Sequence, residues 1–529
     1  MFLDLPVNLL YTIFVYSFIG IYTEIQFMIF STLTESINYM HNLTLEHHYG
    51  IKATEANIAL MSSIINLSGG VGFIISIFFL VPKSDLKGRK YLCVYSRFFL
   101  GFLSSLLQLG AAVFQASELY IIAQCIFCAQ IPIRMFITAL FICECAPDKN
   151  RGFASVALII CDVIGQVIMY SITSTTILGG PSTWFIFPLI CTIASVALFM
   201  TTMKLPESPK WLVKMNRFDE AKKSILFYHG PECDLNTTLI SMLKEKNLTQ
   251  VDKISLSEIW KNDTLREALK LILAVNAFTM LSPIAVEKIY TVQIHNSAGF
   301  EITEVLNINL ILSIIFIPTR FAGTLLIDYF GRRPVLFIAA ALTNIKIWLM
   351  SIALSLAYFE GFSWLSKSLT IVSDSVAELI HGTGSYALMP LLVSELFPPS
   401  ARTVVSQCIL VLTTFSNIPT LFSFPIINSI FPPGFYIPFI FIQPIIVGYL
   451  YIYLPETKAR AVCDIIDSFD QEVTSRRNTL QDERRPLIIR DRTMSLAHKR
   501  GSFLLSTSKS RALTYSYDQK MGAREWNNF

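Results

Sequence analysis

The chain has 529 residues, of which 53% are hydrophobic and only 15% are charged. In soluble proteins about a quarter of all residues are charged. This composition therefore excludes an ordinary soluble domain and indicates a membrane protein. The net charge of +4 is too small to suggest nucleic-acid binding.

From the N-terminus onwards, twelve segments are long and apolar enough to cross a bilayer, which takes about 20 residues per helix. They lie at 9–33, 57–81, 91–114, 119–143, 152–176, 183–203, 268–292, 304–327, 334–357, 369–393, 404–427 and 434–454. Only helices satisfy their own backbone polar groups in lipid over such runs. We therefore predict an all-α membrane protein with twelve transmembrane helices, six in residues 1–203 and six in residues 268–458.

Basic residues indicate which helix ends face the cytosol. They cluster in alternate loops, for example at Lys87, Lys149 and Arg402, so we predict that these loops and both termini are cytosolic. The opposite loops carry few cations. The first of these outer loops contains the sequon Asn42-Leu43-Thr44, which makes Asn42 a predicted glycosylation site.

Two segments lie outside the predicted spans. Residues 204–267 are rich in charge and contain a predicted helix at Phe218–Tyr228, so we expect a cytosolic helical linker. Residues 459–529 form a basic tail with little apolar periodicity, which predicts disorder. In this tail Glu483, Leu487 and Ile488 fit the acidic dileucine pattern, which a clathrin adaptor would bind. The pattern predicts endosomal or lysosomal residence in addition to, or instead of, the plasma membrane.

Three motifs occur once in each half at nearly the same offset. They are Asp85-x-x-Gly88-Arg89-Lys90 with Asp328-x-x-Gly331-Arg332-Arg333, Glu144-x-x-Pro147-x-x-x-Arg151 with Glu395-x-x-Pro398-x-x-x-Arg402, and Pro206-Glu207 with Pro455-Glu456. The glycines allow tight turns, and the charges lie at predicted cytosolic helix ends. We interpret them as a cytoplasmic gate whose ion pairs bias a rocking motion of the two halves. The alternative is that these charges only set the topology.

These motifs, together with PESPKWL at 206–212 and LPETK at 454–458, resemble those of the sugar-porter family of the major facilitator superfamily. The family includes the facilitative glucose transporters, and the resemblance covers residues 1–460. It implies two six-helix halves, a cytosolic helical linker and alternating access around a site at the membrane midplane. Organic-ion carriers share several of these motifs but have a longer first outer loop.

The sugar-binding residues of that family are replaced in this chain. The helix-7 stretch whose amides bind sugar hydroxyls aligns with Thr279–Ala285, which contains no Gln or Asn. The helix-5 Gln, helix-8 Asn, helix-10 Trp and helix-4 Arg of the family align with Ile159, Phe316, Pro390 and Gln124. Because a site built from amides discriminates through paired hydroxyls, this departure argues against the usual mode of hexose binding.

Ionisable and amide side chains lie inside several predicted helices, where they are costly and usually face a cavity or each other. The candidate cavity-lining residues are Glu24, Gln26, Arg134, Asp162, Gln166, Asn276, Glu287, Arg320 and Glu378. Arg134 and Asp162 lie at matching depths, which predicts an ion pair that either fixes two helices or forms a substrate or proton site. Helix 9 is an outer support in the family, so Lys346 is expected to pack or to snorkel.

We therefore expect a transporter that performs no covalent chemistry and needs no cofactor, with a small solute and the bilayer as partners. No nucleophile–base pair or metal site is apparent in the sequence. The charged cavity predicts a polar or charged organic solute, with a proton as a candidate coupling ion. Two alternatives stay open: an organic-ion carrier of the neighbouring branch, and a transport-dead nutrient sensor.

Overall fold

The computed structural model describes residues 6–147, 151–173, 177–231, 233–249, 255–319, 329–359, 361–383, 385–397 and 399–455. These residues form helices and no strand. The chain divides into two compact units, 1–465 and 466–529. The second unit, and with it the predicted sorting motif at Glu483, Leu487 and Ile488, lies outside the described residues.

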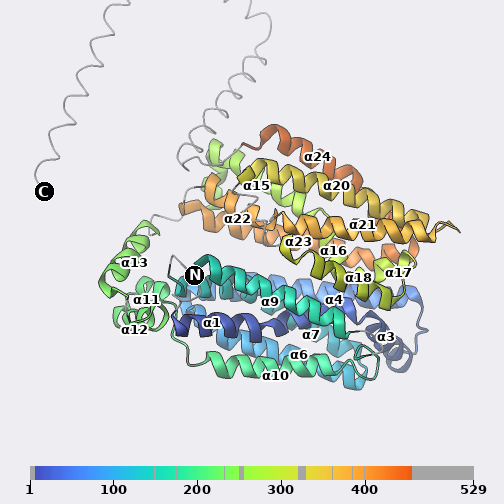
Figure 1. Ribbon diagram of the computed structural model, residues 1–529, viewed down its shortest axis with the longest axis horizontal. Coiled ribbons are helices and arrows are strands. Elements are labelled where there is room, and N and C mark those ends of the chain that lie inside the picture. Colours follow the sequence, from blue (N-terminus) through green and yellow to red (C-terminus); the bar gives the residue numbers. More distant parts are fainter. Residues whose placement is uncertain are drawn as a thin grey trace, which may run out of the picture. The chain divides into compact units, whose positions relative to one another are not determined.

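The helices of the N-terminal half fall into six segments, and each overlaps a predicted span (Figure 1). In chain order they are α1 (Val7–Phe18), η2 (Ile19–Ile21) and α2 (Tyr22–Thr32); α4 (Glu55–Ile75) and η3 (Ser76–Leu80); η4 (Tyr91–Ser96) and α6 (Arg97–Phe114); α7 (Ser117–Pro132), η5 (Ile133–Thr138) and α8 (Ala139–Cys145); α9 (Arg151–Ile172); and α10 (Ile186–Thr202).

The C-terminal half contributes six further segments, again at the predicted places. They are α15 (Asp263–Met280), α16 (Ile284–Ile289) and α17 (Thr291–Ser297); α18 (Ile302–Ile315); α20 (Arg332–Leu356); α21 (Ser363–Gly382) and α22 (Ser385–Leu396); α23 (Pro399–Ile430); and, after the short turn η7 (Pro432–Phe435), α24 (Ile437–Tyr453).

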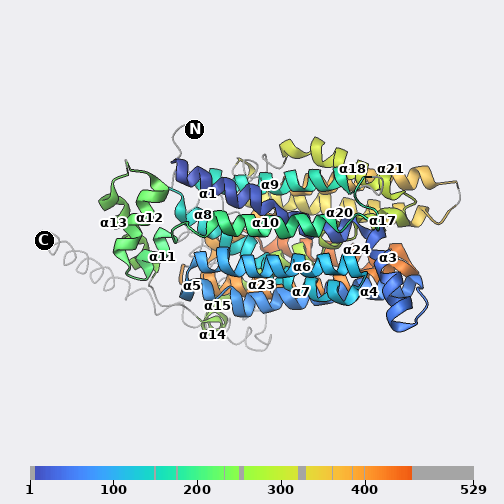
Figure 2. The same ribbon diagram turned by 90° about the horizontal axis from the view of Figure 1, so that it is seen from below.

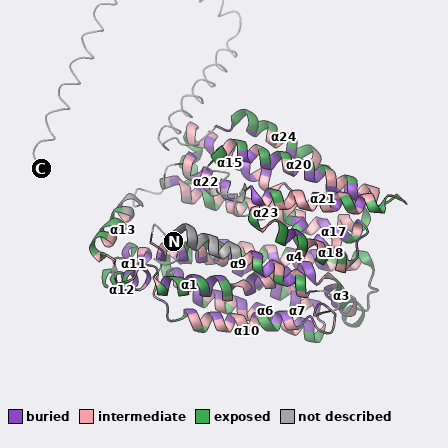
Figure 3. Ribbon diagram, in the orientation of Figure 1, coloured by how far each residue is buried: buried purple, intermediate pink, exposed green. Residues whose placement is uncertain are grey.

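The outer faces of these helices are apolar and suited to lipid. Within the described part of the chain, eight helices are long and apolar enough to cross a membrane, and three shorter apolar helices accompany them. Exposed residues spread along α24 (Figure 3), where Phe441, Ile445 and Ile452 are all exposed. An exposed row of large apolar side chains on a helix of this length is expected where the surrounding medium is hydrocarbon.

The two halves pack against each other chiefly through α4 with α23 and α9 with α18, and also where α2 meets α16 and α17. The α4–α23 contact is close, because a Cβ atom added to Gly70 would lie 2.5 Å from Ile418 Cγ1. Ser63 of α4 also donates a hydrogen bond of 2.8 Å to the carbonyl of Phe422. Glycine at position 70 therefore allows the two backbones to approach.

The linker between the halves forms four helices: α11 (Pro209–Lys214), α12 (Phe218–His229), α13 (Leu235–Thr249) and α14 (Leu256–Lys261). α12 confirms the helix predicted at Phe218–Tyr228. α11, α12 and α13 share a small apolar core that includes Trp211, Ile225 and Met242. Figure 2 shows these helices at one end of the bundle and α3 (Thr34–Tyr49) at the other.

The loop predicted to be the first outer one is mostly helical, which the sequence did not indicate. The sequon falls inside α3, where Asn42 is half-buried and Thr44 is buried. The Thr44 hydroxyl donates to the carbonyls of Met40 at 2.9 Å and Gln115 at 3.0 Å. Glycosylation of Asn42 stays a prediction.

Candidate substrate cavity and cytoplasmic gate

Glu24 of α2 is the centre of an ion-pair network between the two halves. Its carboxylate accepts a hydrogen bond of 3.0 Å from Gln166 Nε2. It lies 3.6 Å from Arg134 Nη1 and 3.5 Å from Lys288 Nζ. Arg134, in the π-helical stretch η5, also pairs with Asp162, so the ion pair predicted from their matching depths is present. Lys288 belongs to α16, and the network therefore joins both halves.

A break in the first transmembrane helix precedes Glu24. The 3-10 turn η2 separates α1 from α2 at this point. Arg97 of α6, which is only 1% exposed, donates to Gly20 O at 3.3 Å and to Thr23 Oγ1 at 3.1 Å. A buried carbonyl at a helix break needs a donor, so Arg97 stabilises the break. Sequence analysis missed this role, because one cation in an apolar helix does not show what it contacts.

A cavity of about 120 Å³ lies beside the network. It is lined by α9 of the N-terminal half and by α16, α17, α18, α20 and α21 of the C-terminal half. Its ionisable lining residues are Glu287, Lys288, His295, Lys346, Asp374, Glu378 and His381. Gln166 and Asn309 add amide groups. The lining thus offers charges of both signs together with uncharged hydrogen-bonding groups.

Lys346 of α20, which was expected to pack or to snorkel, is packed inside the protein and also lines this cavity. Lys346 is 1% exposed and forms an ion pair with Glu287 of α16. The hydroxyl of Tyr436, just before α24, donates to the other Glu287 oxygen at 3.0 Å. The helix turns Lys346 inwards because a buried ammonium needs a carboxylate partner, and Glu287 supplies it.

His295 of α17 and Asp374 of α21 form a second polar pair in the same cavity. His295 Nε2 lies 2.5 Å from Asp374 Oδ2, and Nδ1 lies 2.6 Å from the carbonyl of Thr291. The two ring nitrogens thus fix the orientation of the imidazole between α17 and α21. His295 lies beyond the predicted end of the seventh span at residue 292, which is why sequence analysis did not select it.

The seventh transmembrane helix is broken at the level of the cavity. α15 ends at Met280 and α16 begins at Ile284, so the stretch that aligns with the family's sugar-binding amides falls on the break. Gln443 of α24 is fully buried and donates to the carbonyls of Phe278 at 3.0 Å and Leu281 at 2.5 Å. Discontinuous helices with a partner for their free carbonyls are a recurring feature of transporter binding sites.

Other candidate residues lie elsewhere. Gln26 turns towards α6, where its amide donates to Ser104 Oγ at 3.0 Å and Gln108 Oε1 at 2.9 Å. Asn276 of α15 accepts a hydrogen bond of 2.9 Å from Thr413 of α23. Arg320 lies outside the described residues.

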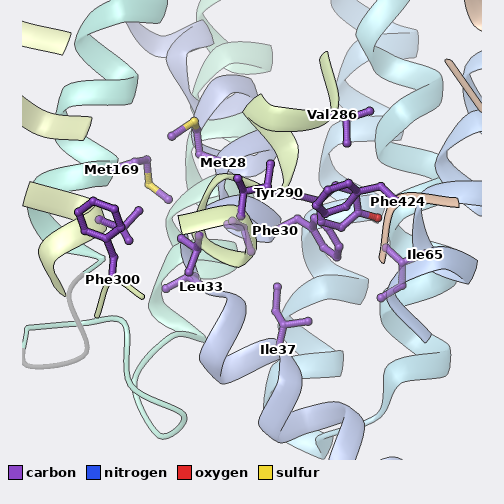
Figure 4. Close-up of a cluster of buried hydrophobic side chains, with 14 of the residues drawn as sticks. Met28, Phe30, Leu33, Ile37, Ile65, Met169, Val286, Tyr290, Phe300 and Phe424 are labelled. Atoms are coloured by element: carbon purple, nitrogen blue, oxygen red, sulfur yellow. The ribbon is translucent and has the colours of Figure 1, made fainter. Parts of the chain in front are cut away.

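A cluster of buried hydrophobic side chains surrounds Tyr290 (Figure 4). The Tyr290 ring packs against Phe30 of α2 and Phe424 of α23, with centroid distances of 5.7 Å and 4.7 Å. Its hydroxyl contacts Asn66 of α4 and donates to the carbonyl of Leu421 at 3.2 Å. Tyr290 therefore ties the seventh helix to the N-terminal half on the outer side of the cavity.

The N-terminal gate motifs come together at the helix ends that the basic residues predict to be cytosolic. Arg89 donates to Glu144 at 3.1 Å and to Asp85 at 3.0 Å, and Asp85 also pairs with Lys214 of α11 at 3.1 Å. Glu207 accepts backbone hydrogen bonds from Lys90 N at 3.0 Å and Ser208 N at 2.9 Å. Ser208 Oγ donates to Glu144 at 2.5 Å. These contacts attach the linker to the N-terminal half.

Two carboxylates of this gate, both outside the membrane spans, have shifted pKa values. Burial raises the pKa of Glu207, although the amides of Lys90 and Ser208 favour its ionised form. Burial also acts to raise the pKa of Asp85, but Lys214 and Arg89 outweigh it and hold this pKa below its ordinary value.

Gly88 is required by this arrangement. Its φ of +101° lies in the region that favours glycine, and an added Cβ atom would lie 2.2 Å from Glu207 Oε2. The absence of a side chain at position 88 lets the Glu207 carboxylate reach the backbone of Lys90.

The C-terminal gate repeats part of the pattern. Arg332 Nη2 lies 2.9 Å from Glu395 Oε1, and Gly331 has a φ of +95°. Arg333 donates to the carbonyl of Tyr451 at 2.8 Å. Arg402 caps the preceding turn through a hydrogen bond of 2.9 Å to the carbonyl of Phe397. Asp328 and Glu456 of this gate lie outside the described residues, as does the side chain of Arg151 in the N-terminal gate.

Comparison with known proteins extends these observations. The family model "Sugar (and other) transporter" matches residues 12–469. The chain is 24% identical to the putative metabolite transport protein YncC of Bacillus subtilis, over 79% of this chain and 87% of that protein. It is 23% identical to the sugar transporter ERD6 of Arabidopsis thaliana, over 78% and 79% of the two chains.

Solved structures show the same fold. The inward open conformation of the xylose transporter XylE from E. coli has a TM-score of 0.67 at 16% identity, and the match covers 86% of this chain and 99% of that one. A crystal structure of a D-xylose-proton symporter has a TM-score of 0.63 at 17% identity, with coverage of 85% and 99%.

Across the described residues, no group of three or more His, Cys, Asp or Glu could hold a metal ion.

Proposed function

Because the chain belongs to the family of sugar (and other) transporters and has the twelve-helix major facilitator fold, we propose that it carries a polar or charged organic solute by alternating access, coupled to a proton. Members of this family move solutes and perform no covalent chemistry. The proposal concerns which solute this chain carries and what drives its movement.

The lining of the central cavity is the observation that carries the proposal. Its ionisable residues include three carboxylates and two lysines, in addition to two histidines. Two pairs, Glu287 with Lys346 and His295 with Asp374, satisfy each other within the C-terminal half. A neutral hexose needs amides and hydroxyls and no such charges, so the cavity suits a solute with an ionisable group.

Glu24 is the candidate proton acceptor. It lies at the boundary of the halves and shares its charge between Arg134 and Lys288. Protonation of Glu24 would weaken both ion pairs and release Lys288, which is 40% exposed at the side chain and lines the cavity. The proton would thereby change both the solute site and a contact between the halves, which is what coupling requires.

The contacts on the two sides support alternating access. On the outer side, Tyr290 and Ser63 make contacts that join the halves. On the cytosolic side, the described pairs Arg89–Glu144 and Arg332–Glu395 each lie within one half. This pattern fits a state closed on the outside, in keeping with the inward open XylE structure.

Uptake into proteoliposomes would test the proposal. The purified protein would be given labelled D-glucose, D-xylose, an organic anion and an organic cation, each with and without an inward proton gradient. We expect an ionisable solute to be taken up faster with the gradient. Uptake of a neutral hexose alone, at a rate unchanged by the gradient, would refute the proposal.

Single-residue variants test which side chains take part in transport. Arg134→Met and Lys288→Met should reduce uptake, whereas Lys52→Met, at an exposed outer lysine, should not. A protein that folds but transports no member of the panel would favour the sensor alternative.

A further inference from the structure

The partners of Glu24 indicate which sign of charge the solute carries. Lys288 Nζ and Arg134 Nη1 lie 3.5 Å and 3.6 Å from its carboxylate. Arg134 has a second carboxylate partner, Asp162, whereas Lys288 forms no second ion pair among the described residues. Of these two cations, Lys288 is the one that lines the central cavity. When Glu24 takes up a proton, Lys288 is therefore the cation that loses its partner at a place that a solute can reach.

The other groups around Glu24 and Lys288 do not neutralise this cation. Gln166 donates an uncharged hydrogen bond of 3.0 Å to Glu24. Arg97 of α6 donates to Thr23 Oγ1 at 3.1 Å, beside Glu24, and adds a positive charge there. Lys288 Nζ also lies 5.5 Å from the ring centroid of Phe27, which holds an ammonium group without cancelling its charge. A charge without a partner inside a membrane protein is unfavourable, so an anion would be stabilised beside Lys288.

The lining offers less to a cation, because two of its three carboxylates already have partners. Glu287 forms an ion pair with Lys346 through one oxygen and accepts a hydrogen bond of 3.0 Å from the Tyr436 hydroxyl through the other. Asp374 Oδ2 lies 2.5 Å from His295 Nε2. A cation would have to displace these contacts, whereas an anion at Lys288 replaces a contact that protonation has already weakened.

The size of the central cavity limits the anion to a small molecule. Its volume is about 120 Å³, and an apolar cavity of about 150 Å³ holds one benzene molecule. L-lactate has as many non-hydrogen atoms as benzene, and it carries a hydroxyl group beside its carboxylate. The amides of Gln166 and Asn309, which line the same cavity, can bind such a hydroxyl.

Building on the transport function proposed above, we propose that the solute is a small organic monocarboxylate, which Lys288 binds when Glu24 is protonated. One proton and one monocarboxylate together leave the net charge of the site unchanged, whereas either of them alone changes it by one unit. A change of net charge in a low-dielectric interior is costly. The carrier should therefore move between its two states either empty or with both bound, which makes transport electroneutral.

Uptake by proteoliposomes tests the charge of the solute. Radiolabelled L-lactate, its uncharged amide L-lactamide and the cation ethanolamine would each be supplied with an inward proton gradient, and uptake by protein-free liposomes would be subtracted. We expect protein-dependent uptake of lactate alone. A potassium gradient with valinomycin would set the membrane potential, and the rate of lactate uptake should be the same at either sign of this potential.

Binding of L-lactate to the purified protein, measured by titration calorimetry at several pH values, tests the two residues. The affinity of the wild-type protein should rise by up to about tenfold for each unit that the pH falls, because one proton binds with the anion. Lys288→Met should weaken binding about tenfold or more, and Lys288→Arg, which keeps the charge, should restore most of it. Glu24→Gln should bind lactate with an affinity that no longer depends on pH. Lys52→Met, at an exposed position outside the cavity, is the control.

Four results would overturn the assignment. Proton-driven uptake of lactamide or ethanolamine in place of lactate would leave the proposed proton-coupled transport intact but exclude a monocarboxylate as its solute. Loss of ethanolamine uptake in Glu378→Gln would then place a cation at the third carboxylate of the lining. Lactate uptake that changes with the membrane potential would exclude electroneutral coupling, and lactate binding that Lys288→Met leaves unchanged would exclude Lys288 as its partner. If the proton gradient drives uptake of none of the three solutes, both this inference and the proposed proton coupling fail.

Discussion

Lys288 Nζ lies 3.5 Å from Glu24 Oε1, and this ion pair joins the C-terminal half to the N-terminal half at the edge of the central cavity. Glu24 is also held by Arg134 and Gln166, both in its own half. Lys288 is therefore the partner that must separate from Glu24 when the halves move apart on the outer side. A change in the charge of Glu24 therefore alters the strength of a contact that must break during this movement.

Replacing Glu24 with Gln tests proton coupling. Gln preserves the shape of the side chain but cannot take up a proton, so transport should lose its response to pH while exchange without a gradient continues. A gradient of one pH unit is worth about 1.4 kcal/mol, or about tenfold accumulation for one proton per solute. We expect Glu24→Gln to abolish this accumulation and Glu46→Gln to retain it. Undiminished accumulation by Glu24→Gln would place the proton site elsewhere.

Gln443→Leu tests the support of the broken seventh helix. The change keeps the approximate volume but leaves the carbonyls of Phe278 and Leu281 without their donor. Leaving buried carbonyls unsatisfied costs about 1–3 kcal/mol, so the melting temperature should fall and solute affinity should weaken. Gln407→Leu, at an exposed position on α23, is the matched control. Equal melting temperatures for both variants would show that the break needs no donor from α24.

The fold could be predicted because its evidence is local in the sequence. Each span is a long apolar run, and the paired motifs mark equivalent helix ends in each half. The breaks within helices 1 and 7 could not be predicted, because they depend on Arg97 and Gln443 from other helices. α3 was also missed, since its sequence is polar and its helix is stabilised by packing.

The charged site was predictable only in part. Matching depth on adjacent helices was sufficient to predict the pair of Arg134 with Asp162. The depth of Lys346 in its helix did not show that it lines the cavity. The orientation of its side chain depends on Glu287 and Tyr436, which come from distant parts of the chain. His295 lies where an apolar run has already ended, so hydrophobicity gave no reason to select it.

Gly88→Ala tests the geometry of the cytoplasmic gate. An added Cβ atom would lie 2.2 Å from Glu207 Oε2, and φ is +101°. Gly361→Ala is the control, because φ is +94° there and nothing lies within 4 Å of the added atom. Backbone strain at a positive φ should by itself lower the free energy of unfolding of both variants by about 1–3 kcal/mol. We expect a larger loss of melting temperature for Gly88→Ala, and equal losses would show that Glu207 moves aside freely.

Replacing Leu487 and Ile488 with Ala tests the sorting motif, which we propose recruits a clathrin adaptor. The change should move the protein from endosomes or lysosomes towards the plasma membrane, as followed by surface biotinylation. Alanine replacement of the nearby Leu504 and Leu505 is the matched control, because that pair has no acidic residue four positions before it. An unchanged surface fraction would show that the motif is inactive.

The attachment of the linker should depend on pH through Glu207. Burial raises the pKa of Glu207, so its contribution to stability is fully present below the ordinary pKa of about 4.3 and is lost as pH rises through the folded value. Asp85 has the opposite sign: its pKa is lowered, so its contribution is present above about 3.9 and is lost only in stronger acid. Between neutral pH and pH 5, the pH dependence of linker attachment should therefore come mainly from Glu207.

Hydrogen exchange in α11 and α12 measures this effect. We expect both helices to be better protected at pH 5 than at pH 7.5, after correction for the intrinsic exchange rate. Glu207→Gln removes the titrating group and should flatten this pH dependence, while Glu220→Gln, at an exposed position on α12, should preserve it. Weaker protection at pH 5 would contradict the assignment, because it would mean that the ionised Glu207, with its two backbone donors, holds the linker more firmly than the protonated form.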